Sequence, residues 1–184
     1  GKAVNKLLIE NFSDVVNEEF TIKIENEFDE IAEGKEEWKQ MIEEFYPLLE
    51  ENKLTCHFQT NCRELEIEVD PDLMARAVQN LLSNAVKYGR DGKQIIIRLE
   101  QEQNVMFSVT NYGLIIPEES LDMIFERFYR VEGARSPGTG GTGLGLNIAK
   151  EIIMLHGGTI AVESSLQGTV FSVEIPLEKI TEDA

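Results

Sequence analysis

The stretch that constrains this chain most is "DPDLMARAVQNLLSNAVKYG", residues 70–89, because both of its ends carry residues typical of helix termini. Asp70 is a good N-cap, and Pro71 suits the first helical position. Gly89 is a natural residue for the position that follows a last helical turn. The sequence therefore predicts a helix over residues 71–88.

Segments with the period of a β-strand lie on both sides of this helix. "LTCHF" and "LEIEV" precede it, and "QIIIRLE" and "VMFSVT" follow it with "QEQN" between them, which indicates a β-hairpin. A second helix is predicted from about Leu144 to Leu155, and "TIAVES" and "TVFSVEI" follow as strands. Helices mixed with an antiparallel hairpin favour an α+β fold over a doubly wound parallel sheet.

The first quarter of the chain has a different character. Residues 1–46 hold five lysines against thirteen Asp and Glu residues. "AVNKLLIENF" and "GKEEWKQMIEEFY" carry apolar residues at helical spacing, and Pro47 then interrupts the pattern. We predict a helical appendage with few strands over residues 1–46 and a separate domain over residues 47–184.

Charge and composition exclude several kinds of partner and site. The formal net charge is −17, whereas nucleic acids and anionic membranes attract basic surfaces. We therefore expect no nucleic-acid binding and no direct membrane contact. Cys56 and Cys62 match no common zinc or redox spacing and are expected to be free thiols. The two histidines, His57 and His156, are expected to be structural.

A glycine-rich stretch, "GTGGTGLGLNIAK", holds five of the fourteen glycines within eight positions. Gly138, Gly140 and Gly143 have the spacing of a dinucleotide fingerprint, but no strand comes directly before them, and the Lys of a P-loop is missing. A polar loop remains, which leads into the helix near Leu144. Free N–H groups at a helix N-terminus bind anions, so the loop is either a phosphate site or a flexible connection.

Asn80, Asn84 and Lys87 share one face of the helix predicted over residues 71–88. Asparagine is less favourable than alanine in a helix by roughly 0.6 kcal/mol, so two on one face call for a reason. Carboxamide oxygens can ligate Mg²⁺, which proteins usually hold together with substrate phosphates. An exposed polar surface is the alternative explanation.

The stretch "VTNYGLIIPEE" predicts a strand that ends at Asn111 and turns at Gly113. A short polar side chain at a strand end, close to a glycine, can offer hydrogen bonds to a planar base. An ordinary turn that contains asparagine is the alternative.

In this order, the motifs resemble those of the catalytic ATP-binding domain of sensor histidine kinases, in the wider group of gyrase, Hsp90 and MutL. "NLLSNAVKYG" is similar to the N box, "NYGLIIPEE" to the G1 box, "IFERFYR" to the F box and "GGTGLGL" to the G2 box. "GTVFSVEIP" resembles the final strand, and the likeness covers about residues 47–177. It implies the Bergerat fold, a two-layer α/β sandwich that binds ATP. Within the sensor kinases, the motifs most resemble those of the vancomycin-resistance type.

The resemblance also implies roles for single residues on the predicted helix. Asn84 would ligate Mg²⁺, and Asn80 would support that site. Lys87 would contact phosphate, and Asn80 and Lys87 would be the catalytic residues. Tyr88 would border the nucleotide.

The remaining residues of the implied site lie in the later motifs. Asn111 would meet the amino group of adenine, and Gly113 would let the base approach. Arg127 and Arg130 would face the phosphates from a mobile lid over about residues 126–142. The nucleotide-binding part of the glycine-rich loop would comprise Gly141, Thr142, Gly143, Leu144 and Gly145.

The sequence departs from the family in the G1 box, which usually reads Asp-x-Gly-x-Gly. Asn111 stands in place of the Asp, and Ile115 stands in place of the second Gly. An amide both donates and accepts hydrogen bonds, whereas a carboxylate only accepts them. We therefore expect weaker selectivity or affinity for adenine, and a different turn at Ile115.

The side chain at position 80 distinguishes a kinase from an ATPase in this group. In the gyrase-like relatives, a Glu four residues before the Mg²⁺-binding asparagine activates water, but an amide cannot act as that base. Without such a base, catalysis would depend on positioning and charge stabilisation. This favours phosphoryl transfer to another group over hydrolysis by water. The alternatives are an ATPase of this group, or a nucleotide-binding module without catalysis.

The resemblance implies partners outside this chain. The phosphate acceptor would be a histidine on a helical dimerisation domain, which no segment here resembles. A response regulator would complete the two-component system, and this chain would be the cytoplasmic portion of a membrane-bound sensor.

Residues 1–46 resemble a different family, the type IA DNA topoisomerases, mainly through "FDEIAEGKEEW" in a helical stretch. The likeness includes neither the catalytic tyrosine region nor the acidic metal site, so it implies no topoisomerase activity. Our hypothesis is an engineered chimera in which this segment replaces the dimerisation domain, and a natural linker is the alternative.

Overall fold

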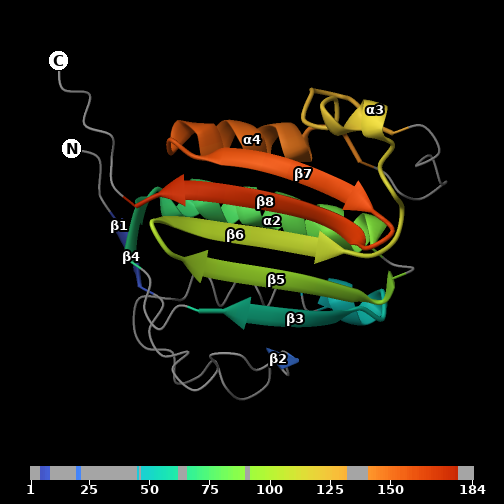
Figure 1. Ribbon diagram of the computed structural model, residues 1–184, viewed down its shortest axis with the longest axis horizontal. Helices are drawn as coiled ribbons and strands as arrows, with labels where there is room; N and C mark the ends of the chain where they lie inside the picture. Colours follow the sequence, from blue (N-terminus) through green and yellow to red (C-terminus); the bar gives the residue numbers. More distant parts are fainter. Residues whose placement is uncertain are drawn as a thin grey trace.

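In a computed structural model, the fold centres on a sheet with the strand order β2-β3-β5-β6-β8-β7 (Figure 1). β3 runs parallel to β5, and the other neighbouring strands are antiparallel. The strands are β2 (Phe20–Thr21), β3 (Thr55–Thr60), β5 (Gln94–Gln101), β6 (Asn104–Asn111), β7 (Thr159–Ser165) and β8 (Gly168–Pro176). The structure describes residues 5–8, 20–21, 45, 47–61, 66–89, 92–131 and 141–177.

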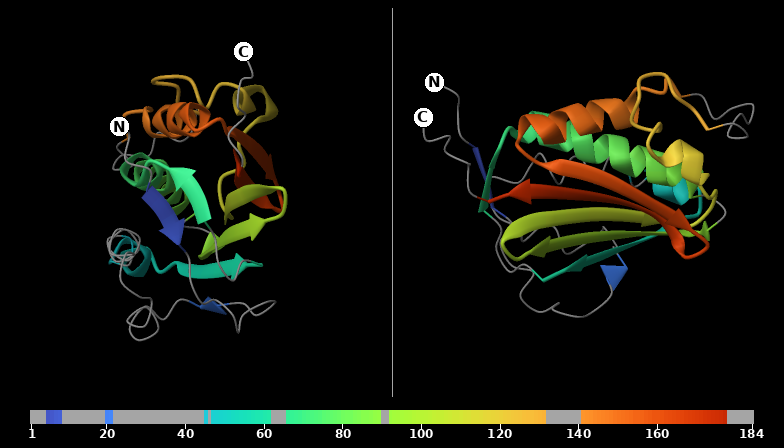
Figure 2. Two further views of the ribbon diagram at one scale, coloured as in Figure 1. Left: turned by 90° about the vertical axis from the view of Figure 1, so that its left-hand side faces the viewer. Right: turned by 45° about the horizontal axis from the view of Figure 1, so that its top comes forward.

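Two helices cover one face of this sheet (Figures 1 and 2). α2 (Pro71–Tyr88) and α4 (Gly145–Leu155) lie side by side, and a short helix, α3 (Glu118–Leu121), follows β6. The predicted α+β class and two-layer arrangement are confirmed. The hairpin predicted around "QEQN" is also confirmed, because β5 and β6 pair from Ile95↔Asn111 to Gln101↔Val105.

The ends of α2 lie where the sequence predicts them. The carboxylate of Asp70 accepts a hydrogen bond of 3.0 Å from the N–H of Leu73, and Pro71 is the first helical residue. At the other end, the N–H of Gly89 donates to the carbonyl of Ala85. The buried side of the helix consists of Met74, Ala77, Val78, Leu81, Leu82, Ala85 and Val86.

His156 joins the two long helices. Its Nε2 accepts a hydrogen bond of 3.0 Å from the backbone N–H of Asp70, at the start of α2. Its Nδ1 lies 2.7 Å from the carbonyl oxygen of Ile152 and must donate there, because a carbonyl only accepts. Both ring nitrogens are therefore engaged in hydrogen bonds, in agreement with the structural role predicted for His156.

The core lies between the sheet and the helices. Every second residue of the central strands faces α2 and α4, and Ile95, Val109 and Phe171 are each no more than 1% exposed. Phe125 packs edge-to-face on Phe171, with ring centroids 6.2 Å apart. This contact fixes the start of the "IFERFYR" motif to the centre of the sheet.

The structure corrects part of the prediction for residues 1–46. Asn5–Leu8 form strand β1, which pairs antiparallel with β4 (Glu66–Val69), so the helix predicted in "AVNKLLIENF" is wrong there. A short apolar run fits either period, and pairing with a distant strand decided the outcome. Residue 45 is helical, and the rest of "GKEEWKQMIEEFY" before it lies outside the described residues.

Cys56 in β3 is a free thiol, as predicted. Burial raises its pKa to about 12, so the thiol stays protonated and unreactive near neutral pH. The second cysteine, Cys62, lies outside the described residues.

We predict that Asp70→Ala lowers the free energy of unfolding by about 1 kcal/mol, because the first turn of α2 loses its capping acceptor. Asp70→Asn is the matched control, since an asparagine oxygen caps equally well. Urea unfolding followed by circular dichroism measures both variants. Equal destabilisation by the two substitutions would contradict the capping role.

Candidate nucleotide-binding site

The polar face of α2 meets the N-terminus of α4. A Cβ atom placed on Gly145, the first residue of α4, would lie 3.7 Å from Oδ1 of Asn80. Leu144, which precedes α4, makes no side-chain capping hydrogen bond, and the first N–H groups of a helix have no partner within it. Nδ2 of Asn80 is buried and has no hydrogen-bond partner among the described residues. Such a concentration of unpaired donors is suited to an anion.

Lys87 and the glycine-rich loop also meet. A Cβ atom on Gly141 would lie only 2.5 Å from Nζ of Lys87. The same ammonium group lies 5.0 Å from the centre of the Tyr88 ring. Asn84 is half-buried and shares the helix face with Asn80 and Lys87. Residues that are far apart in the sequence thus form one polar surface.

A backbone hydrogen bond joins the two ends of the predicted lid. The N–H of Phe128 donates a hydrogen bond of 2.9 Å to the carbonyl of Gly143. Gly143 has φ +70°, and a Cβ atom there would lie 2.9 Å from the backbone of Phe128, so a larger residue is disfavoured. Thr142 is exposed next to this junction. Residues 132–140 of the lid lie outside the described part of the chain.

Arg127 is held by α4 in this structure. Its guanidinium forms an ion pair of 2.8 Å with Glu151, which raises its pKa, and its Nε lies 3.3 Å from Oδ1 of Asn147. Both charged side chains are more than half exposed, so the pair is weak. The predicted phosphate contact of Arg127 would require it to leave Glu151. Arg130 is half-buried, and its phosphate contact stays a prediction.

The other end of the site contains a buried amide. Asn111 is only 1% exposed, and neither its Oδ1 nor its Nδ2 has a hydrogen-bond partner in the described ranges. Each unpaired buried polar group costs about 1–3 kcal/mol. A donor and an acceptor that are both buried and unpaired therefore lie at the end of β6.

Two glycines bring this amide close to α2. A Cβ atom on Gly113 would overlap the carbonyl oxygen of Tyr88, and one on Gly89 would lie 2.9 Å from Cβ of Asn111. The end of β6 thus packs directly on the last turn of α2. The structure brings Asn111, Gly113 and Tyr88 together, as the predicted base site requires.

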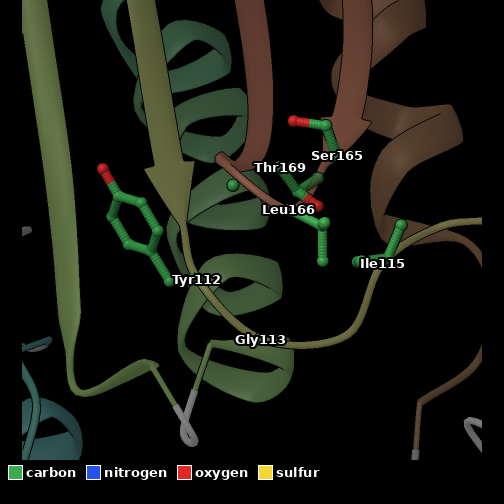
Figure 3. A pocket seen from close by; sticks show the side chains of 7 residues that line it. Tyr112, Gly113, Ile115, Ser165, Leu166 and Thr169 are labelled. Atoms are coloured by element: carbon green, nitrogen blue, oxygen red, sulfur yellow. The ribbon is translucent and has the colours of Figure 1, made fainter.

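A small hollow opens at the adjoining end of the sheet (Figure 3). Ile115 and Leu166 line it from the loop after β6 and the β7–β8 turn. Its volume of about 90 Å³ is far below the roughly 300 Å³ at which ordinary ligand pockets begin. Ile115 is 42% exposed here, so its side chain lies toward the surface. The full lining is Tyr112, Gly113, Ile115, Ser165, Leu166, Gly168 and Thr169.

Two polar residues of this region were missed by the sequence analysis. Thr169 is 4% exposed and lies directly opposite Asn111 on β8. Its hydroxyl is 2.6 Å from that of Ser164, which also accepts a hydrogen bond from the N–H of Ile116. The "GTVFSVEIP" motif contains Thr169, but strand pairing was needed to show that it neighbours Asn111.

The comparison with protein families agrees with this geometry. The family described as "Histidine kinase-, DNA gyrase B-, and HSP90-like ATPase" matches residues 69–179, which include both long helices and the central strands. The chain belongs to this family.

Known sensor proteins are similar to about three quarters of the chain. Sensor protein VanSC of Enterococcus gallinarum is 39% identical over 75% of this chain and 38% of its own length. Sensor protein VanS of Enterococcus faecium is 44% identical over 74% of this chain and 35% of its own length. The chain thus spans little more than a third of the length of these relatives.

Solved structures of histidine kinases share the fold. The catalytic domain of histidine kinase ThkA has a TM-score of 0.67 and 28% identity, covering 87% of this chain and 95% of that domain. A structure of ThkA in complex with response regulator protein TrrA has a TM-score of 0.64 and 28% identity, covering 88% of this chain and 42% of that one.

We predict opposite outcomes for two alanine substitutions. Gly113→Ala should lower the free energy of unfolding by about 1–3 kcal/mol, because the new methyl group meets a backbone carbonyl that cannot move aside. Gly141→Ala should change it by less than about 0.5 kcal/mol, because only the flexible end of Lys87 must shift. Urea unfolding of both variants checks the difference, and similar stabilities would contradict the close packing at Gly113.

Proposed function

We propose that this chain binds Mg²⁺–ATP across α2 and the N-terminus of α4 and transfers the γ-phosphate to a histidine on another domain. The observation that carries the proposal is the buried, unpartnered amide of Asn111. A purine base can satisfy such an amide, and the unpaired donors near Asn80 and Leu144 are suited to the phosphates.

Asn84 is the proposed protein ligand of Mg²⁺. Its amide oxygen is a hard donor, as this cation requires. The described residues contain no group of three or more His, Cys, Asp or Glu side chains that could hold a metal ion. This fits a cation that takes its other ligands from phosphates and water. When bound, the cation neutralises charge on the phosphates.

The phosphates would lie against donors from three elements. Lys87 supplies a positive charge from α2, and Arg130 supplies one from the start of the lid. Arg127 would add another after exchanging Glu151 for phosphate. The backbone N–H groups of the loop and of the first turn of α4 would complete the site, at Gly141, Thr142, Gly143, Leu144 and Gly145.

Asn80 favours transfer over hydrolysis in this proposal. A side-chain amide does not take up a proton near neutral pH, so it cannot activate a water molecule. Its role would be to position the neighbouring groups, while the nucleophile arrives with another domain. An ATPase of the same family and a non-catalytic nucleotide-binding module are the competing functions.

The proposed acceptor lies outside this chain. Both ring nitrogens of His156 already make hydrogen bonds, so that residue is not available as an acceptor. The named sensor relatives and the ThkA–TrrA complex support an acceptor domain and a response regulator as partners. No helix in the described ranges is long and apolar enough to cross a bilayer. We propose that the chain is the cytoplasmic kinase part of a membrane-bound sensor of the vancomycin-resistance type.

The test is phosphorylation in trans. Incubation with labelled ATP, Mg²⁺ and a histidine-containing dimerisation domain should label that domain, with little phosphate release when the domain is left out. Steady phosphate release without an acceptor would favour the ATPase. Binding of ATP without either outcome would favour the non-catalytic module.

Asn84→Ala should remove the Mg²⁺-dependent part of ATP affinity and leave the fold intact. Removing a residue that hydrogen-bonds to a metal ligand typically weakens metal binding about 10–100-fold. Removing the ligand itself should weaken it at least as much. Calorimetry with and without Mg²⁺ measures the effect. Ser83→Ala is the control, because Ser83 is exposed on the same helix. Unchanged binding in Asn84→Ala would remove Asn84 from the proposed role.

We also propose that residues 1–46 are a fused segment rather than part of the kinase domain. Their likeness to a type IA topoisomerase supports this, although β1 and β2 pair with β4 and β3. Limited proteolysis should leave residues 47–184 folded and able to bind ATP. Loss of ATP binding together with the segment would show that the two parts form one unit.

A further inference from the structure

We infer that Asn111 allows this site to bind 6-oxopurine nucleotides, such as inosine and guanosine triphosphates, in addition to ATP. The inference rests on the proposed function, because it concerns which bases the same site accepts. It depends on two facts: the residue is an amide, and no described residue fixes the orientation of that amide.

The backbone of Asn111 is held firmly while its side-chain amide is not. β6 pairs with a strand on each side at this position, through Ile95 on β5 and Thr169 on β8. Oδ1 and Nδ2 are both buried, yet neither has a hydrogen-bond partner in the described part of the chain. The hydroxyl of Thr169, the polar group across the strand, is already engaged with Ser164. A half-turn about the Cβ–Cγ bond exchanges the oxygen and the nitrogen without breaking a hydrogen bond.

The two orientations are complementary to different bases. Adenine presents an amino donor at position 6 beside an acceptor at N1. Hypoxanthine and guanine present an oxygen acceptor at position 6 beside an N1–H donor. An amide can match either pattern, with its oxygen toward the donor and its NH₂ group toward the acceptor. The rotation therefore adapts one side chain to both classes of purine.

A carboxylate at this position would discriminate between the bases. It has acceptors only, so it accepts a hydrogen bond from the 6-amino group of adenine but repels a 6-oxo group. Charged hydrogen bonds and unpaired buried acceptors both carry large free energies, the first favourable to binding and the second unfavourable. Asn111→Asp should therefore restore a strict preference for adenine.

Calorimetric titration with Mg²⁺–ATP and Mg²⁺–ITP tests the inference. ITP is the better probe, because hypoxanthine differs from adenine at positions 6 and N1 and lacks the extra amino group of guanine. The unmodified chain should bind ITP within about tenfold of ATP, and Asn111→Asp should shift the ratio toward ATP by about tenfold or more. Gln167→Glu is the matched control, since it makes the same change in an exposed side chain and should keep the ratio.

The outcomes separate this inference from the proposed function. If the unmodified chain binds ATP but binds ITP more than about tenfold more weakly, the inference is overturned and the proposed function stands. An unchanged ratio in folded Asn111→Asp also overturns it. Binding of neither nucleotide overturns both proposals. Should Asn111→Asp fail to fold by circular dichroism, Asn111→Ala replaces it and should weaken both nucleotides equally, whereas a loss confined to ATP would contradict the inference.

Discussion

The direct packing of the end of β6 on the last turn of α2 is the contact on which the site depends. Glycines at positions 89 and 113 leave no side chain between the two backbones, and a methyl group at either position would meet neighbouring atoms. As a result, Asn111 lies at the interface of the sheet and the helix, next to Gly89. The same helix carries Asn80, Asn84 and Lys87 along its length, so one rigid element links the two ends of the site.

Several polar atoms are buried in this molecule without partners among the described residues. Those in the site are Nδ2 of Asn80 and both amide atoms of Asn111. The free-energy cost of each is appreciable, and the extensive apolar core around Val109 and Phe171 tolerates it. A ligand that pairs with these atoms would remove that cost. Such a site holds its polar side chains in place before the ligand arrives, which lowers the entropic cost of binding, while the amide of Asn111 can still turn to match the ligand.

The arrangement also separates rigid from adjustable parts. α2 and α4 are joined by His156 at one end and pack on the sheet along their length, so the polar face of α2 cannot move independently. Arg127, by contrast, is held by an exposed ion pair with Glu151, and such pairs contribute little free energy. Arg127 can therefore leave Glu151 and bind a phosphate group without disturbing the core.

Much of the site could be predicted because its key features are local. The ends of α2 follow from Asp70, Pro71 and Gly89, and a helix of known bounds necessarily aligns Asn80, Asn84 and Lys87. The error at Asn5–Leu8 arose where local pattern was ambiguous, since a short apolar run fits a strand or a helix. The neighbourhood of Thr169 and Asn111 could not be read from the sequence, because it depends on the pairing of strands far apart in the chain.

The sequence by itself determined which residues can donate, accept or carry charge, and it determined α2, the β5–β6 hairpin and the order of the motifs. These depend on side-chain chemistry and on interactions between residues a few positions apart. Only the tertiary structure decided that the amide of Asn111 is buried without a partner and that Lys87 meets Gly141. It also decided that Arg127 is held by Glu151. Such facts depend on contacts between distant segments, which are fixed by packing and strand register rather than by local preference.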